Sequence, residues 1–107
     1  MKTSEKLKLV RDFLEKPENW IKGSYTKGNA CCLVGAMMER IPQTETYGEE
    51  ADIVSNVIKQ LAAQRPEAKQ YNHRGMVTGF NDDPLTTHAD VLEVLDIAIK
   101  DAKEQGR

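Results

Sequence analysis

Nine consecutive residues of this chain, Ala30 to Met38, carry no charge and read ACCLVGAMM. Asn29 precedes them and is a good helix N-cap, whereas Pro42 follows and cannot continue a helix. These boundaries predict a helix over residues 30–41. Because the segment is apolar on every side, we expect it to lie at the centre of the fold, enclosed by other helices.

The small residues of this segment indicate where a neighbour packs. A glycine inside a helix costs about 1 kcal/mol relative to alanine, so Gly35 needs a compensating contact. Cys32, Gly35 and Ala36 are spaced i, i+3, i+4 and therefore share one face of the helix. We expect another backbone to approach closely there, with a neighbouring helix resting on the strip.

Apolar residues recur with helical spacing in three further segments, residues 4–16, 49–65 and 88–106. Thr87 and Asp90 form an acidic variant of the capping box at the start of the last segment. The sequence therefore predicts a mainly α fold, a single helical domain over residues 1–107 with about four main helices packed round the central apolar helix. A short two-stranded β element that pairs residues 76–78 with residues 24–26 is a further expectation.

The composition is that of a globular domain. Of the 107 residues, 30% are charged and 39% are hydrophobic, and the net charge is −2. This charge does not favour nucleic-acid binding, and Lys6, Lys8 and Arg11 alternate with acids as on a solvated helix face. The longest uncharged run is too short to cross a bilayer, and the charged N-terminus is unlike a secretory signal. We expect a cytoplasmic protein without membrane association.

The adjacent thiols of Cys31 and Cys32 are the first candidates for chemistry. Two cysteines and two distant histidines do not supply the spacing of a metal site, so no metal and no cofactor is expected. A disulfide between neighbouring residues would be strained. Free cysteines are usually buried and behave as small hydrophobes. We therefore favour a packing role for both.

A catalytic alternative remains open, because a thiol near a helix N-terminus has its thiolate favoured by the helix dipole. A histidine could then act as the base, with an acid or amide to orient it. This would be a thiol-dependent hydrolase or transferase. Its groups would come from Cys31, Cys32, His73, His88, Asn81 and Asp82, with Cys32, His88 and Asp82 as the main set.

The densest polar cluster outside the predicted helices lies in the loop from His73 to His88. A binding groove between this loop and residues 20–28 is one interpretation. The ligand-binding candidates are Trp20, Tyr25, His73, Arg74, Asn81, Asp82, Asp83 and His88. The other interpretation is turn chemistry, in which Asn81 and Asp82 bond their own backbone and Asp83 caps a turn that begins at Pro84.

Several short motifs occur together in this order along the chain. They are Trp20 with Gly23, Cys32-x-x-Gly35-Ala36, Phe80-Asn81-Asp82, and Asp90-Val91 with Leu95 and Ala98. This order resembles a family of small bacterial, actinobacterial and phage proteins known only as a domain of unknown function. Many of those relatives carry Trp at the position of Phe80. The resemblance implies a common fold over most of the chain and implies no activity.

Two functions are therefore expected from different classes. The first is a small non-catalytic binding module whose partner is a protein, a second copy of the chain or a small ligand. The second is the thiol-dependent enzyme. They differ in whether a cysteine is exposed and reactive.

Overall fold

The computed structural model describes residues 1–64 and 75–107. Its elements in chain order are α1 (Thr3–Leu14), the 3₁₀ turn η1 (Pro17–Asn19), β1 (Thr26–Lys27), β2 (Ala30–Cys31), α2 (Leu33–Arg40), α3 (Gly48–Gln64), α4 (Met76–Asp82) and α5 (His88–Glu104). The predicted mainly α fold is confirmed.

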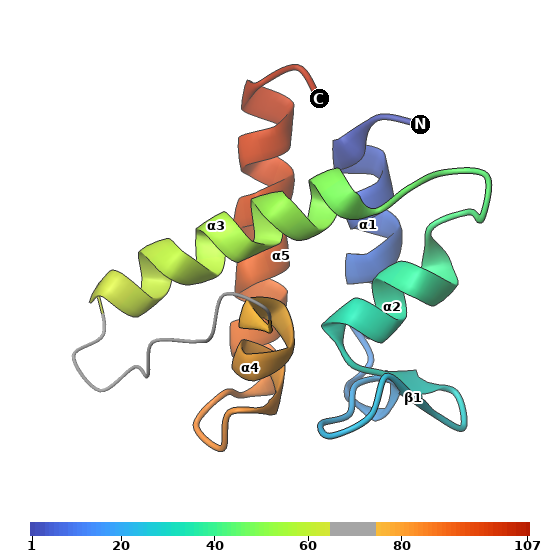
Figure 1. Ribbon diagram of the computed structural model, residues 1–107, viewed down its shortest axis with the longest axis vertical. Coiled ribbons are helices and arrows are strands. Elements are labelled where there is room, and N and C mark those ends of the chain that lie inside the picture. The colour runs from blue at the N-terminus through green and yellow to red at the C-terminus, as the bar shows by residue number, and fades with distance from the viewer. Residues whose placement is uncertain (65–74) are drawn as a thin grey trace.

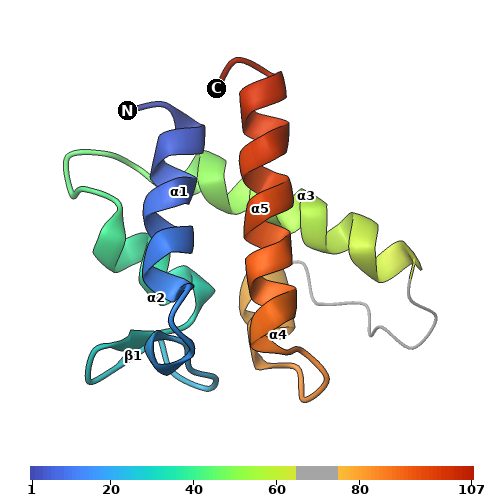
Figure 2. The ribbon, with the colours of Figure 1, turned by 180° about the vertical axis from the view of Figure 1, so that it is seen from behind.

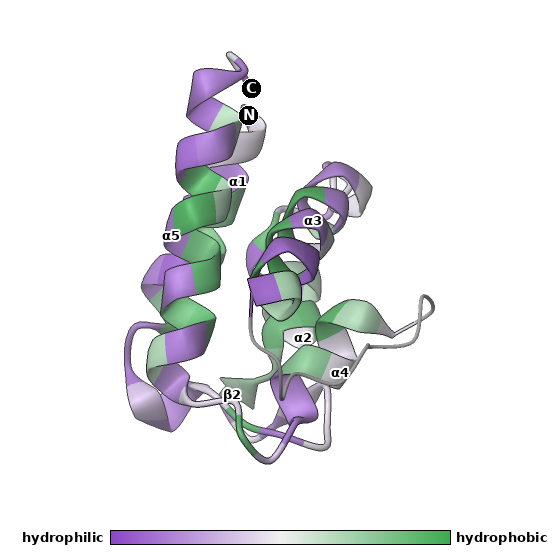
Figure 3. Cartoon of the chain, turned by 90° about the vertical axis from the view of Figure 1, so that its left-hand side faces the viewer, coloured by the Kyte–Doolittle hydropathy of each residue, from purple (hydrophilic) through white to green (hydrophobic). Residues whose placement is uncertain are grey.

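The helices form two layers. Figures 1 and 2 show α1 and α5 side by side, with α3 crossing them, and both chain ends lie at the same end of the molecule. Seen from the side, α1 and α5 make one layer and α2, α3 and α4 make the other (Figure 3). The core lies between the layers. Its fully buried side chains include Leu7, Val10, Leu14, Leu33, Met37, Val54, Val91, Val94 and Leu95.

Local sequence signals account for several boundaries. Thr87 is the N-cap of α5, its side chain accepts from the backbone N–H of Asp90, and the Asp90 carboxylate accepts from the N–H of Thr87. Both halves of the predicted capping box are therefore present. Pro17 opens η1, and Gly23 ends the turn region with a φ of 84°. Only glycine adopts such a φ without strain.

The helix predicted over residues 30–41 starts later than expected. Ala30 and Cys31 are extended and form β2, which pairs antiparallel with β1 in the register Thr26↔Cys31. The turn between the strands contains Gly28, with a φ of 63°. Cys32 is also extended and is the N-cap of α2. The hairpin therefore takes the first residues of the apolar run, and the helix begins at Leu33.

The expected strand over residues 76–78 was wrong, because these residues are the first turn of α4. β1 pairs instead with its neighbour in sequence, residues 30–31, across a tight turn. The likeness of Met-Val-Thr to a strand was overridden by packing, since Val77 and Phe80 are three residues apart and both are buried.

The expectation that α2 is enclosed on all sides was also wrong. Leu33, Ala36 and Met37 are completely buried, but the side chain of Met38 is 45% exposed. In Figure 1, α5 has the more central position and α2 lies to one side, against α1. α2 packs against α1, α4 and β2, and Met38 lies on the face that these elements leave near solvent.

Gly35 has the close backbone contact that was predicted, with a different partner. A Cβ at this position would lie 1.8 Å from the carbonyl oxygen of Tyr25. The same oxygen accepts a hydrogen bond from the N–H of Cys32, at 3.1 Å. The loop before β1, and not a helix, therefore rests on the small residues at the start of α2.

Lys6 differs from the solvated lysine that the sequence predicted. It is buried, and its Nζ lies 3.2 Å from Oε1 of Glu50, which is completely buried in the first turn of α3. Lys6 Nζ also donates to the carbonyl oxygen of Thr46, at 2.9 Å. Neither carboxylate oxygen of Glu50 accepts a hydrogen bond within the described residues. Lys6 thus supplies the counter-charge of a buried acid.

Among residues 1–64 and 75–107, no helix is long and apolar enough to cross a membrane.

Candidate functional site

The polar residues that the sequence singled out meet at Asn81, near the end of α4. The Asn81 side chain is completely buried. Its Oδ1 accepts from the indole N–H of Trp20 at 2.7 Å and from the backbone N–H of Leu33 at 3.1 Å. Its Nδ2 donates to the carbonyl of Ile21 at 3.0 Å and to Oδ1 of Asp82 at 3.0 Å. An amide has two donors and two acceptor positions, so its hydrogen-bonding capacity is complete.

The next two acids also tie α4 to the segment after η1. Oδ1 of Asp82 accepts from the N–H of Gly23 at 2.9 Å, and Lys22 Nζ donates to the carbonyl of Asp83 at 2.7 Å. Oδ1 of Asp83 accepts from the N–H of Leu85, two residues on, which is the expected turn chemistry. Asn81 and Asp82, which were expected to bond their own backbone, form hydrogen bonds with residues that are distant in the sequence. The two segments that were expected to flank a groove are therefore hydrogen-bonded to each other.

His88 and Trp20 lie beside this cluster. The Nε2 of His88 is 2.6 Å from the carbonyl oxygen of Leu14, the last residue of α1. A carbonyl only accepts, so Nε2 carries the proton and caps the end of that helix. The rings of His88 and Trp20 have their centroids 6.0 Å apart. Tyr25 lies apart in the loop before β1, where its side chain is exposed.

His73 and Arg74, the remaining ligand-binding candidates, lie outside the described residues. For Trp20, Asn81, Asp82, Asp83 and His88 the geometry gives a structural use, and the role of every candidate toward a ligand stays a prediction. The cluster of Trp20, Asn81, Asp82 and His88 holds α1, α2, α4 and the turn after η1 together.

Both thiols are buried, with Cys31 3% and Cys32 2% exposed. Cys32 Sγ accepts from the N–H of Gly35 at 3.3 Å and so acts as the N-cap side chain of α2. Burial raises the pKa of the Cys31 thiol, the Glu39 carboxylate raises it further, and the Arg40 guanidinium partly opposes the rise. A raised pKa leaves less thiolate at neutral pH, which is the reverse of an activated nucleophile.

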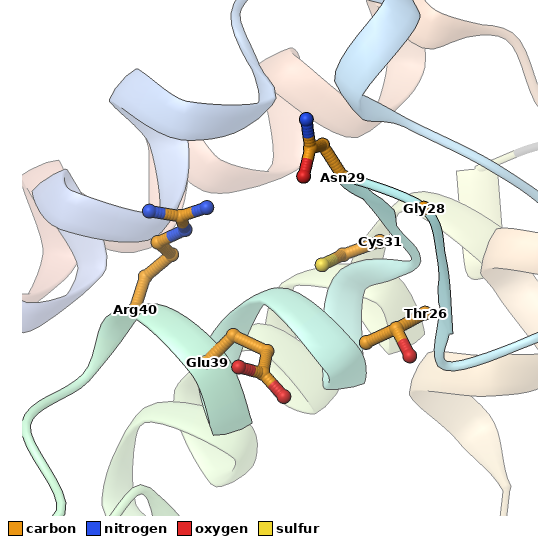
Figure 4. Close-up of a pocket in the computed structure, with 6 residues that line it drawn as sticks. All are labelled: Thr26, Gly28, Asn29, Cys31, Glu39 and Arg40. Carbon is orange, nitrogen blue, oxygen red and sulfur yellow. The ribbon is translucent and has the colours of Figure 1, made fainter.

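A polar hollow lies where the hairpin meets the last turn of α2 (Figure 4). Its volume is about 210 Å³, and Cys31 lies at its base. The lining residues are Thr26, Gly28, Asn29, Cys31, Glu39 and Arg40. We call this feature the hairpin hollow.

Two opposite charges line the hairpin hollow without an ion pair. Within the described segments, neither Glu39 nor Arg40 pairs with a charged side chain, although Arg11, Arg107 and Lys6 do. The Arg40 guanidinium instead lies over the ring of Phe13, with Cζ 3.8 Å from the ring centroid. Stacking holds the guanidinium in place and leaves the N–H donors along its edge available.

No sequence pattern pointed to Glu39 and Arg40 as site residues. They follow directly after the apolar run and were counted as the end of a helix. The missed signal is the Gly28-Asn29 pair, since such a dipeptide between two short segments is typical of a hairpin. A hairpin there would have placed Thr26 and Cys31 opposite each other. Only the packing of α2 on α1 brings Phe13 under Arg40.

The hairpin hollow offers few metal ligands. Among its lining residues only the Cys31 thiol and the Glu39 carboxylate are usual donors, fewer than the three or four that bind zinc tightly. Elsewhere in the part of the chain that the structure describes, no three His, Cys, Asp or Glu residues are grouped to hold a metal ion.

The comparisons with known proteins give a family and no activity. The family model described as "Family of unknown function (DUF6197)" matches residues 1–101. This match confirms the resemblance to a family of unknown function. The comparison with curated proteins finds no match, and the comparison with solved structures finds none either.

Proposed function

Because the chain belongs to this family of unknown function, we propose from its own geometry that it is a small cytoplasmic binding module that holds a small polar ligand in the hairpin hollow. No covalent chemistry is part of this function. The ligand is held by the side chains that line the hollow, chiefly Glu39 and Arg40.

The observation that carries the proposal is the position of the Arg40 guanidinium and its lack of an ion pair. Its guanidinium lies over the ring of Phe13, and no salt bridge joins it to an acid of the described residues. A charged group that is positioned but unpaired loses little conformational entropy when a ligand binds it. The volume of about 210 Å³ lies below the range of about 300–1,000 Å³ that is typical of pockets for drug-sized molecules, so the ligand is small.

The geometry supports the binding module over the thiol enzyme. Cys32 Sγ is already engaged as a helix cap, and the Nε2–H of His88 is donated to Leu14. Cys31 does reach the hollow, but burial and the nearby Glu39 carboxylate keep its thiol protonated. A nucleophile needs a base within hydrogen-bond reach and access to its substrate.

A thermal-shift screen tests the proposal. The full chain is heated with a panel of small carboxylates, amines and amino acids, each in excess. A ligand at about 100 times its Kd stabilises the folded state by about 2.7 kcal/mol. For a domain of this size that raises Tm on the order of 10 °C. We expect at least one class of compound to raise Tm of the parent and to have no effect on Arg40→Met.

Arg11→Met is the matched control, because Arg11 is an arginine that does not line the hollow and instead forms exposed ion pairs with Glu15 and Asp96. Its response to the panel should equal that of the parent. The proposal fails if no compound raises Tm, or if Arg40→Met responds as the parent does.

A further inference from the structure

We infer that the ligand of the hairpin hollow is dipolar, with a carboxylate and an ammonium group, and is the size of a free amino acid or a dipeptide. This inference rests on the proposed function and deepens it. It follows from the charges of the hollow, their arrangement and its size.

The donor side of the hollow consists of Arg40 and Asn29. A guanidinium presents parallel N–H groups that match the two oxygens of a carboxylate. Stacking on Phe13 occupies the face of the guanidinium and leaves its edge for such a pair. The amide of Asn29 lies in the same half of the hollow in Figure 4 and adds two donors. This side therefore fits an anion.

The acceptor side consists of Glu39 and Thr26. In Figure 4 the Glu39 carboxylate and the Thr26 hydroxyl lie on the opposite side of the Cys31 sulfur from the Arg40 guanidinium and the Asn29 amide. A carboxylate and a hydroxyl oxygen both accept hydrogen bonds, as an ammonium requires. This side therefore fits a cation.

The two sides together select a ligand with both charges. A simple anion would be attracted by Arg40 but repelled by the carboxylate of Glu39. A simple cation would be attracted by Glu39 but repelled by the guanidinium of Arg40. Like charges placed together across an interface are costly. A volume of about 210 Å³ is below the range of about 300–1,000 Å³ for drug-sized ligands and therefore fits a short zwitterion.

Isothermal titration calorimetry with three related peptides tests the inference. Glycylglycine carries both charges, N-acetylglycylglycine lacks the ammonium, and glycylglycine amide lacks the carboxylate. We expect glycylglycine to bind the full chain and each capped form to bind at least tenfold more weakly. Equal or tighter binding of a capped form, or no binding of all three, would overturn the inference.

Two surface variants assign each charge to its partner. In Arg40→Gln, glycylglycine and its amide should bind equally, because the guanidinium that pairs with the ligand's carboxylate has been removed. In Glu39→Gln, glycylglycine and the N-acetyl form should bind equally. Arg11→Gln should preserve both preferences. If Arg40→Gln still prefers glycylglycine to its amide, or Glu39→Gln still prefers glycylglycine to the N-acetyl form, this assignment is wrong.

The outcomes separate this inference from the proposed function. If singly charged compounds raise Tm in the thermal-shift screen and the effect depends on Arg40, the hollow is a binding site and the dipolar ligand is wrong. If no compound of the panel stabilises the chain, the proposed function itself is wrong.

Discussion

Asn81 shows how a polar residue that resembles part of a binding site can belong to the scaffold. Its side chain joins Trp20, Ile21 and Leu33, which come from two other parts of the chain. The sequence could identify Asn81 as unusual but not name these partners. They are distant in the sequence, and only the packing of α4 on α2 places them within reach.

Replacing Asn81 by alanine tests this use. Asn81→Ala leaves the buried N–H of Leu33 and the part-buried indole N–H of Trp20 and carbonyl of Ile21 without their partner, and a buried unsatisfied group costs about 1–3 kcal/mol. We expect a loss of at least about 3 kcal/mol in the free energy of unfolding, measured with urea. Asp82→Asn, which keeps an acceptor oxygen, should stay within about 1 kcal/mol of the parent. Parent-like stability of Asn81→Ala would show that the network is unimportant.

Cys32 is a second residue whose chemistry is structural. Cys32→Ala removes the cap acceptor and leaves a small cavity, so we expect it to cost about 1–2 kcal/mol of stability. Cys32→Ser keeps an acceptor, and serine is a preferred N-cap, so its loss in urea denaturation should be smaller. A catalytic cysteine predicts a different result, in which both variants are as stable as the parent and both lose an activity.

At the scale of the helices and strands, the ion pair between Lys6 and Glu50 joins α1 to α3. Helical periodicity predicted both helices, but a count of alternating charges placed Lys6 in solvent. The error arose because one lysine on a charged helix face can turn inward when a buried acid on another helix needs a counter-ion. Periodicity describes one helix at a time and carries no information on such partners.

Removal of one member of this pair should be strongly destabilising. Lys6→Met leaves the buried Glu50 carboxylate without its counter-ion, which typically costs about 3–5 kcal/mol. The double variant Lys6→Met/Glu50→Leu should recover most of that loss, since no buried charge remains. Lys8→Met is the control, because its pair with Asp12 is exposed and is worth less than about 1 kcal/mol. Urea midpoints that place Lys6→Met level with Lys8→Met would contradict the burial of this pair.

The hairpin of β1 and β2 is the element that the sequence pattern did not predict. Its strands have two residues each, which is too short for an alternating pattern to appear. Gly35 was nevertheless interpreted correctly as a point of close backbone approach. The loop at Tyr25 provides that approach, and the hairpin that follows displaces the start of α2 to Leu33.

At the scale of the whole molecule, the cluster around Asn81 and the proposed binding site adjoin through the Ile21 N–H, which donates to the carbonyl of Cys31, but they use different side chains. The cluster around Asn81 fixes the end of α4, whereas the hairpin hollow is formed by the hairpin and the exposed end of α2. The helical class, the last helix cap and the turn at Pro17 could be predicted from local signals. The hollow could not, because it depends on how a hairpin of two-residue strands packs against the last turn of α2.

Our main functional claim is that a ligand binds at the hairpin hollow and not at the cluster around Asn81. The direct test is a ¹H–¹⁵N correlation spectrum of the full chain during titration with glycylglycine. We predict saturable shifts concentrated in residues 26–31 and 39–40, with residues 80–83 little changed. Shifts centred on residues 20–23 and 80–83, or no saturable shift at all, would contradict the claim.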